Sequence, residues 1–449
     1  METVFRIESA RIIAAAARVV RDVGLAEEIA QDALVEALEQ WPRTGIPDNP
    51  AAWLTTTARR RAVDLVRRRE TYARKLAELG RDLDEAAYDP EPAGPDDIDD
   101  DLLRLIFTAC HPVLPPDARI ALTLRLLGGL TTDEIARAFL APEATVAQRI
   151  VRAKRSLAKA GVAFEVPYGP ERSQRLAAVL EVIYLIFNEG YSATVGDDLI
   201  RPALCEDALR LARQLAALMP AEAEAHALAA LLEIQASRTA ARTDPEGRPV
   251  LLADQRRARW DRLLIRRGFA ALTRAGDLGG APGPYALQAA IAACHARART
   301  YEETDWAAIA ALYARLAELA PSPVVELNRA VAVSMAEGPE AGLAVVDAVA
   351  GAPVLKSYHL LPSVRGELLA RLGRPAEARA EFARAARLTR NARERTLMLR
   401  RADAVGPPES ADPGGPDAPG APGGPGTPGA PGTPGAPGAP VREPRPGTP

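Results

Sequence analysis

Residues 131–155 read TTDEIARAFLAPEATVAQRIVRAKR, and they give the clearest indication of the fold. Apolar residues recur at helical spacing on either side of a short turn, which predicts two helices, 131–140 and 145–160. Ala136 is small enough to let the two helices cross closely, and Thr145 is expected to cap the second helix. The side chains predicted to form the buried seam are Ile135, Val146 and Ile150. Two helices joined in this way are typical of a helix-turn-helix.

The second of these helices is strongly basic. Residues 145–160 include five basic side chains and no acidic one, which suits a helix that enters a DNA major groove. Gln148 and Arg149 are expected at base edges, and the residues that follow them at phosphates. The side chains predicted to face DNA are Thr145, Gln148, Arg149, Arg152, Lys154 and Arg155. The alternative is an ordinary helical hairpin whose basic face is solvated.

A second basic helix is predicted earlier in the chain, from Ala51 to about Tyr72. Six arginines and one aspartate occupy the eleven positions 59–69, a density that suits a phosphate backbone. These arginines are Arg59, Arg60, Arg61, Arg67, Arg68 and Arg69. Trp53 is expected in the core, with stacking on bases as the alternative, because Leu54, Ala58 and Val63 share its apolar helical face. A solvated arginine face is the alternative here too.

The composition of all 449 residues favours an all-α protein of about three domains. Aromatic residues make up 4% of the chain, so strand-forming side chains are sparse. The cysteines, Cys110, Cys205 and Cys294, are far apart and form no CxxC, which favours a reducing cytoplasm. No apolar stretch reaches the ~20 residues that a bilayer requires, and the N-terminus does not resemble a secretion signal. We therefore expect a cytoplasmic protein without a membrane anchor.

Changes in composition divide the chain into segments. From Asp84 to Asp101 there are nine acidic side chains and no basic one, which predicts a flexible acidic linker. Further on, segments 335–350 and 370–386 resemble each other, and the second carries small and aromatic residues in the order by which tetratricopeptide (TPR) helices pack. The last segment is Pro/Gly low complexity and is expected to be disordered. The predicted segments are 5–72, the linker 73–100, 101–161, the helical repeat 170–403 and the tail 406–449.

Together these segments resemble the extracytoplasmic-function class of bacterial sigma factors, which retain sigma regions two and four. The resemblance implies that 5–72 is region two, which binds core RNA polymerase and recognises the −10 promoter element through the six arginines above. It implies that 101–161 is region four, whose helix-turn-helix recognises the −35 element. The helix from Ala26 to Trp41 resembles the one that docks on the polymerase clamp. Its residues expected at polymerase are Glu28, Gln31, Asp32 and Glu36.

Further stretches of the sequence indicate which subgroup of this class the chain resembles. The stretches 107–112, 126–132 and 184–192 are similar to those of the subgroup whose sigma core is fused to a TPR-like C-terminal domain. The family implies that this domain regulates the factor, in response to either a regulatory protein or a small-molecule signal. Ala147 departs from the pattern, since many relatives carry a basic residue there, which leaves the −35 bases that are read in doubt. The acidic linker resembles a segment threaded through polymerase, and a passive tether is the alternative.

No catalytic site is predicted, and we expect no enzyme activity, cofactor or metal. The sequence contains neither a GxSxG motif nor a phosphate-binding glycine loop. Cys110 and His111 are adjacent without a second pair nearby, which argues against a metal site. Tyr184, Phe187 and Tyr191 share one helical face, where core packing is expected and a ligand pocket is the alternative.

The sequence therefore predicts a sigma factor that brings core RNA polymerase to promoter DNA. The chief rival is a repressor or activator that binds DNA through 131–155 and senses a ligand through its C-terminal repeats. That alternative leaves 5–72 unexplained. A helical scaffold without nucleic-acid function would not explain two separate Arg-rich helices.

Overall fold

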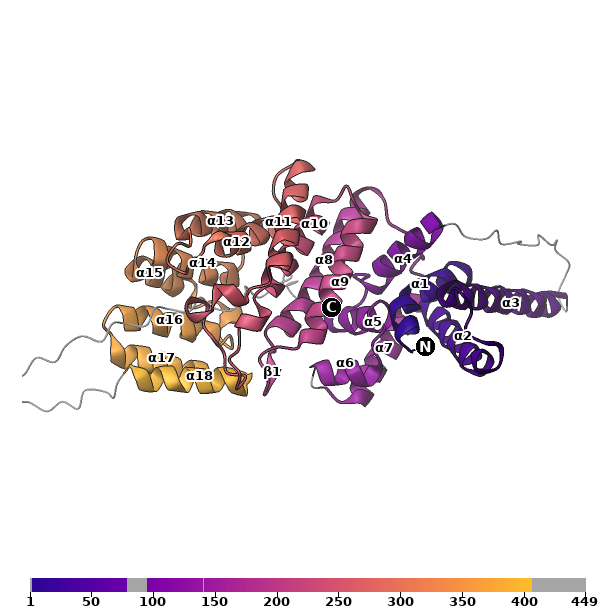
Figure 1. The fold of residues 1–449 in the computed structure, drawn as a ribbon, viewed down its shortest axis with the longest axis horizontal. Helices are drawn as coiled ribbons and strands as arrows, with labels where there is room; N and C mark the ends of the chain where they lie inside the picture. Colours follow the sequence, from indigo (N-terminus) through magenta and orange to yellow (C-terminus); the bar gives the residue numbers. More distant parts are fainter. Residues whose placement is uncertain (1, 79–94, 140, 406–449) are drawn as a thin grey trace, which may run out of the picture. The chain divides into compact units, whose positions relative to one another are not determined.

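The computed structural model describes residues 2–78, 95–139 and 141–405 (Figure 1). Within these ranges the chain forms eighteen α-helices, four short 3-10 helices and one pair of two-residue strands, which confirms the all-α class. The helices gather into two compact units, Met1–Ile183 and Tyr184–Pro449. None of the described helices combines the length and the apolar character that a membrane crossing requires.

The first unit begins with a helical bundle in which α1 packs against the three helices that follow it. Its helices are α1 Glu2–Val20, α2 Val23–Thr44, α3 Pro50–Glu78 and α4 Pro95–Ala109. Small side chains let these helices approach closely, because an alanine occupies little space between two backbones. The fully buried alanines of the first three helices are Ala14, Ala16, Ala17, Ala26, Ala30, Ala33, Ala37, Ala58 and Ala62.

Two boundaries in this bundle differ from the prediction. The helix expected to end at Trp41 continues through Pro42 and ends where Gly45 adopts a φ of 86°. Proline is tolerated there because it lies in the last turn, where only one backbone hydrogen bond is lost. The predicted linker is also shorter, since α3 extends to Glu78 and α4 begins at Pro95, a residue favoured at the first position of a helix. Positions 79–94 of the predicted linker, and the predicted tail 406–449, lie outside the described residues.

The second part of the first unit contains α5 Pro116–Leu126, α6 Thr132–Phe139 and α7 Glu143–Lys159. The first half of α8, Gly169–Tyr191, also belongs to it. Arg175 donates a hydrogen bond to the carbonyl of Phe107 at 3.1 Å, and Arg119 forms an ion pair with Glu181 at 3.1 Å. These contacts fix α8 on α4 and α5. The compact unit therefore continues beyond residue 170, where the sequence suggested that a new segment begins.

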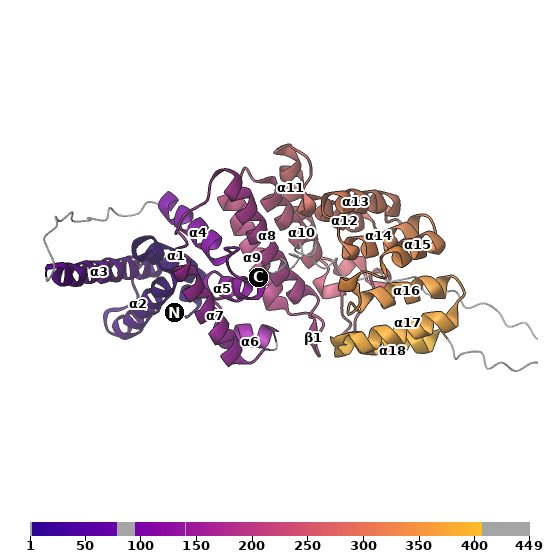
Figure 2. The ribbon, with the colours of Figure 1, turned by 180° about the vertical axis from the view of Figure 1, so that it is seen from behind.

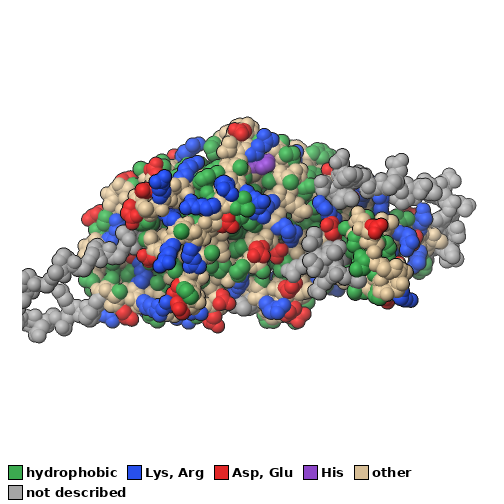
Figure 3. All heavy atoms as spheres, viewed as in Figure 1, with side chains coloured by type: hydrophobic (Ala, Val, Ile, Leu, Met, Phe, Trp, Pro, Cys, Tyr) green, Lys and Arg blue, Asp and Glu red, His purple; other side chains and the backbone are tan. Residues whose placement is uncertain are grey.

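The second unit is a helical array in which consecutive helices pack against one another. Figures 1 and 2 both show α16, α17 and α18 side by side. The surface mixes charges: Figure 3 shows Arg and Lys side chains interspersed with Asp and Glu. The α-helices of this array are α9 Pro202–Leu218, α10 Ala223–Ala236, α11 Arg262–Asp277, α12 Pro284–Arg297, α13 Trp306–Leu319, α14 Pro323–Ala336, α15 Pro339–Val349, α16 Leu360–Arg371, α17 Pro375–Leu388 and α18 Ala392–Ala404. The 3-10 helices are η1 Thr239–Ala241, η2 Leu252–Asp254, η3 Arg257–Arg259 and η4 Pro353–Leu355.

The two similar segments of the sequence fall on matching helix pairs. Residues 335–350 cover the end of α14 and all of α15, and 370–386 cover the end of α16 and most of α17. In the second pair, Gly373 turns the chain with a φ of 69°, while Phe382 packs in the core. Close approach is built in at Gly366, where an added Cβ would lie 3.1 Å from the Phe382 ring. These features are compatible with TPR-like packing, which stays a prediction.

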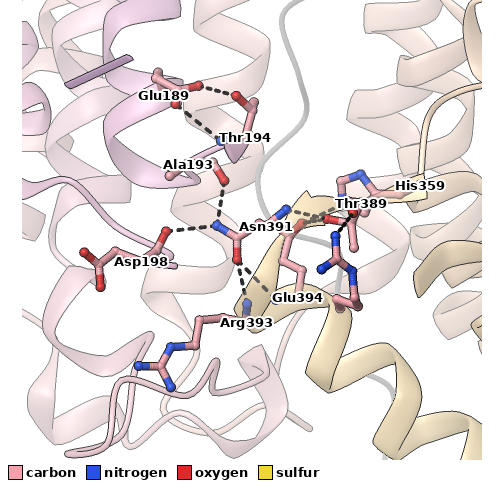
Figure 4. A network of polar contacts seen from close by, with 10 residues as sticks. Glu189, Ala193, Thr194, Asp198, His359, Thr389, Asn391, Arg393 and Glu394 are labelled. Atoms are coloured by element: carbon pink, nitrogen blue, oxygen red, sulfur yellow. Dashed lines mark hydrogen bonds and ion pairs between the residues drawn. The ribbon is translucent and has the colours of Figure 1, made fainter. Parts of the chain in front are cut away.

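A parallel strand pair joins the start and the end of the second unit. β1 Val195–Gly196 pairs with β2 Arg390–Asn391. The fully buried amide of Asn391 donates to the carbonyls of Ala193 and Asp198 at 3.0 and 2.9 Å (Figure 4). Its oxygen accepts from two backbone N–H groups at the start of α18. One side chain thus caps the last helix and fastens it to the segment that follows α8.

Candidate nucleic-acid interface

The helix-turn-helix predicted from the sequence is formed by α6 and α7. Thr131 and Glu134 make a reciprocal capping box at the start of α6, with hydrogen bonds of 2.8 and 3.1 Å. The seam side chains Ile135, Val146 and Ile150 are 1%, 1% and 5% exposed, and Ala136 is 4% exposed, so the predicted packing is confirmed.

The start of α7 differs from the prediction. The helix begins at Glu143 with Pro142 as its N-cap, and Thr145 makes no side-chain cap. Pro142 fixes the backbone at the turn, which lets the helix start earlier than a threonine cap would imply. Thr145 instead lies exposed in the first turn. It remains available for the predicted contact with DNA, although its structural role was wrongly assigned.

The outward face of α7 carries most of the side chains predicted to contact DNA. Four of them are exposed: Thr145, Gln148, Arg152 and Arg155. Arg149 is half-buried and forms an ion pair with Asp117 of α5 at 3.4 Å, with the aspartate exposed. The pair orients Arg149 while leaving one side of it exposed to solvent. An exposed row of cations beside a polar side chain is suited to phosphate and base-edge contacts.

Lys154 lies on a different face of α7 from these side chains. Its ammonium group is 2.5 Å from a carboxylate oxygen of Glu27 in α2, and Arg125 of α5 reaches the other oxygen at 2.6 Å. Glu27 is 5% exposed, so this is a nearly buried carboxylate that holds two cations. The phosphate contact predicted for Lys154 would require this pair to open.

The arginines of α3 differ in exposure and in pairing. Arg60, Arg67, Arg68 and Arg69 are exposed along the helix, and Arg60 also forms an ion pair with Glu36 at 3.7 Å. Arg61 forms ion pairs with Glu36 at 2.7 Å and with Asp32 at 3.6 Å, which join α3 to α2. Arg59 is half-buried, and near the start of the helix Trp53 packs edge-on against the buried Trp41 with ring centroids 5.4 Å apart. The exposed set therefore forms a cationic surface on a helix that is anchored at its other face.

The same ion pairs involve two residues predicted to contact polymerase, Asp32 and Glu36. The Glu36 side chain is 15% exposed and paired with Arg61, whereas Asp32 is 64% exposed. Glu28 and Gln31 are exposed. Sequence reasoning missed two apolar side chains on the same outer face, Val35 and Leu38, which are 52% and 51% exposed. Their spacing from the buried positions of α2 would have identified them, because neither falls on the buried face.

Cys110 and His111 make structural contacts in the region around α4 and α5. The Cys110 thiol is buried against the Thr123 hydroxyl at 3.3 Å, and burial raises the pKa of Cys110 to about 11. His111 accepts a hydrogen bond from the Val113 backbone N–H, and burial is the main cause that lowers the pKa of His111. In the described part of the chain, no three His, Cys, Asp or Glu side chains are grouped to hold a metal ion.

Comparison with known proteins assigns families to three stretches. Residues 4–71 match Sigma-70 region 2, and residues 104–157 match Sigma-70, region 4. Residues 175–276 match a family of unknown function, DUF6596. No solved structure matches the chain.

Individual relatives agree with these assignments. The ECF RNA polymerase sigma factor SigK of Mycobacterium tuberculosis (strain ATCC 25618 / H37Rv) is 33% identical over 156 residues, which are 33% of this chain and 78% of the relative. The protein of the same name in Mycobacterium ulcerans (strain Agy99) is 32% identical over 155 residues, with the same coverage of 33% and 78%. An uncharacterized protein of Rhizobium meliloti (strain 1021) is 48% identical over 393 residues, 86% of this chain and 91% of the relative. With both sigma-70 regions in order and relatives of this kind, the chain belongs to the ECF RNA polymerase sigma factors.

Proposed function

We propose that the chain binds core RNA polymerase and directs it to promoters, with α3 at the −10 element and α7 at the −35 element. The observation that carries this proposal is the pair of exposed cationic surfaces, on two helices that belong to separate sigma-70 regions of one chain. Phosphate contacts give such surfaces affinity and register, while base contacts give specificity. The chain itself supplies recognition, and polymerase carries out RNA synthesis.

The outer face of α2 supports polymerase as the partner. Val35 and Leu38 expose apolar surface beside the polar side chains of Glu28 and Gln31. An apolar centre with a polar rim is the usual composition of a protein interface. The clamp of polymerase is the partner that the sigma-70 family provides for this helix.

Replacing Leu38 by Asp tests the docking face. Leu38→Asp is expected to weaken binding to core polymerase about tenfold or more, because a charge would be buried at the centre of the interface. The matched control is Leu399→Asp on α18, since Leu399 is 48% exposed against 51% for Leu38. Binding is measured by fluorescence anisotropy of the labelled full chain titrated with core polymerase. Equal affinity of the two variants would exclude this face as the docking site.

Replacing Arg152 by Ala tests the −35 reader. The variant is expected to weaken binding of the polymerase complex to promoter DNA several-fold and to flatten its salt dependence, as loss of a phosphate contact does. Arg266→Ala, an exposed arginine on α11, is the control. The free protein should bind the same DNA much more weakly than the complex does. Tight, specific binding by the free protein would favour a conventional repressor or activator.

We further propose that the region 170–403 regulates the factor, through a regulatory protein or a small-molecule signal. The supporting observation is that the second unit has its own core and its own fastening between β1 and β2. A unit that lies outside both stretches matched to the sigma-70 regions is available for control. Transcription by the full chain and by a chain that ends at Ile183, compared in one assay, tests this role.

A further inference from the structure

The second unit contains a cavity of about 360 Å³, large enough for a metabolite-sized molecule. It lies among the end of α8, the segment after it, the 3-10 turns near residue 250, α16 and α18. Apolar side chains such as Leu251, Leu397 and Met398 form much of its wall. Of the three aromatic side chains Tyr184, Phe187 and Tyr191, Tyr191 lines this cavity.

Two guanidinium groups in the cavity wall are held without a carboxylate partner. Arg242 is 6% exposed, lies 3.8 Å over the ring of Tyr191 and donates to the backbone carbonyl of that residue. Arg238 lies 5.2 Å from the centre of the Trp260 ring. Burial lowers the pKa of Arg238, and the charge of Arg242 lowers it further. Within residues 141–405, neither arginine has an acidic side chain within ion-pair distance.

The carboxylates that also line the cavity are already engaged. Glu189 pairs with Arg201 and accepts from the Thr194 hydroxyl at 2.9 Å. Glu394 pairs with His359 at 3.0 Å and accepts from the Thr389 hydroxyl at 2.8 Å (Figure 4). Of the two cations, Arg242 is buried and Arg238 is half-buried, and neither pairs directly with a carboxylate of the cavity wall. A buried charge is costly unless an opposite charge or hydrogen bonds compensate it.

Polar atoms in the same wall also lack partners. The hydroxyl of Tyr191, a residue that is 1% exposed, has no hydrogen-bond partner among the described residues. The same is true of the Nε of Arg238 and of the side-chain oxygen of Gln255, a residue that is 7% exposed. Buried polar groups in folded proteins are nearly always hydrogen-bonded, so unpaired groups that line one cavity point to a bound molecule.

We infer that this cavity binds a small organic anion, whose carboxylate or sulfonate group lies against Arg238, Arg242 and the Tyr191 hydroxyl and whose apolar body contacts Leu397 and Met398. Guanidinium groups and a phenol donate hydrogen bonds to an anion that shares their burial. The inference deepens the regulatory role proposed above and rests on it. It gives that role a chemical class of signal.

The cavity lies beside the contact that fastens α18 to the segment after α8. Glu394 and Met398 of α18 form part of its wall, and Asn391 fastens the same helix to the carbonyls of Ala193 and Asp198 (Figure 4). A ligand that contacts both α8 and α18 would stabilise this fastening. Binding and fastening are then linked, because a ligand that binds the fastened arrangement favours it.

The test uses the full chain and the fluorescent sulfonate 8-anilinonaphthalene-1-sulfonate as the probe. We expect one bound probe per chain, displaced by octanoate at a concentration at least about tenfold lower than by the neutral octanamide. Replacing both Arg238 and Arg242 by Gln should weaken probe binding about tenfold or more. Arg259→Gln is the control, since this exposed arginine only donates to the carbonyl of Thr243.

Tyr191→Phe covers the case in which the double variant does not fold. This variant removes an unpaired hydroxyl, so it should fold like the original and bind the probe about two- to fivefold more weakly. Equal displacement by octanoate and octanamide, or unchanged probe affinity in Tyr191→Phe, would overturn the inference. The assay contains neither polymerase nor DNA. A negative result for probe binding would therefore not contradict the promoter function. A negative result in transcription would not contradict anion binding in the cavity.

Discussion

Glu27 joins α2 to α5 and α7 through two ion pairs. Its carboxylate holds Arg125 and Lys154 at 2.6 and 2.5 Å and is almost completely buried. Glu27→Ala would leave Arg125 and Lys154, both partly buried, without this carboxylate, although Arg125 keeps its hydrogen bond to the carbonyl of Leu130. We expect the substitution to destabilise this contact by about 3 kcal/mol. Hydrogen exchange of the peptide 143–159 reports the change, because it isolates α7 from the second unit.

The neighbouring position supplies the control for this prediction. Glu28 is exposed and forms no ion pair within the described residues. Glu28→Ala should therefore change the exchange of the same peptide by no more than about 0.5 kcal/mol. Similar protection in both variants would show that Glu27 does not hold α7.

Glu394 gives a prediction about pH. Burial raises its pKa, but the hydrogen bonds from His359 and Thr389 and the charge of Arg242 outweigh burial, so the pKa lies below its ordinary value of 4.5. Because folding lowers this pKa, the ionised group stabilises the fold above about pH 4.5, and the stabilisation is lost as the pH falls through the lowered pKa.

Glu394→Gln should therefore destabilise the second unit at pH 7 by about 1–3 kcal/mol. The difference from the original chain should shrink steadily below pH 4.5, where the carboxylate becomes protonated in both states. Urea unfolding at a series of pH values measures it. A difference that stays constant down to pH 3 would mean that Glu394 acts through packing and not through its charge.

At the scale of elements, α10 and α11 approach each other closely at Gly268. A Cβ added at Gly268 would lie 2.5 Å from Ile234 of α10, so Gly268→Ala must push the helices apart. We expect a loss of about 1–3 kcal/mol in the free energy of unfolding. The same helix provides the control at Gly276, where an added Cβ meets nothing within 4 Å.

Gly276→Ala should leave stability unchanged or raise it by up to about 1 kcal/mol, because alanine favours the helix. Thermal unfolding of the two variants distinguishes close packing from helix propensity. If both substitutions shifted the melting temperature alike, the approach of α11 to α10 would not be as close as described.

Elements with a regular apolar period could be predicted from the sequence, and their ends could not. Ile135, Val146 and Ile150 share one helical face, so the helix-turn-helix and its seam were predicted and confirmed. The start of α7 at Glu143 was missed because proline and threonine are both common at the start of a helix, and the sequence offers Pro142 as well as Thr145. The exposed Val35 and Leu38 were missed because apolar residues on a helix are normally assigned to its buried face.

At the scale of the whole molecule, contacts between distant parts of the sequence were out of reach. Nothing local shows that Glu27 meets Arg125 and Lys154, or that Asn391 fastens α18 to residues 193–198. Such pairs arise from tertiary packing and not from spacing along the chain. The same is true of the cavity around Arg238, since its walls come from segments far apart in the sequence.

The stability of the first unit should depend on where the chain is truncated, because contacts between distant segments hold it together. A chain that ends at 169 loses the hydrogen bond from Arg175 to Phe107 and the ion pair between Arg119 and Glu181, whereas a chain that ends at 183 keeps both. The shorter chain should be less stable by about 2–4 kcal/mol, because Arg119 loses its acidic partner and the Phe107 carbonyl loses its hydrogen-bond donor. Urea unfolding of the two truncated chains checks this. Equal stability would place the boundary of the unit at 169.

The most direct test of the promoter function is run-off transcription by purified core RNA polymerase on a library of upstream regions, with and without this protein. We expect transcripts that depend on the protein, that share one pair of −35 and −10 elements, and that weaken with Arg152→Ala but not with Arg266→Ala. Absence of any protein-dependent transcript, with tight binding of the free protein to DNA, would contradict it and favour a conventional repressor or activator.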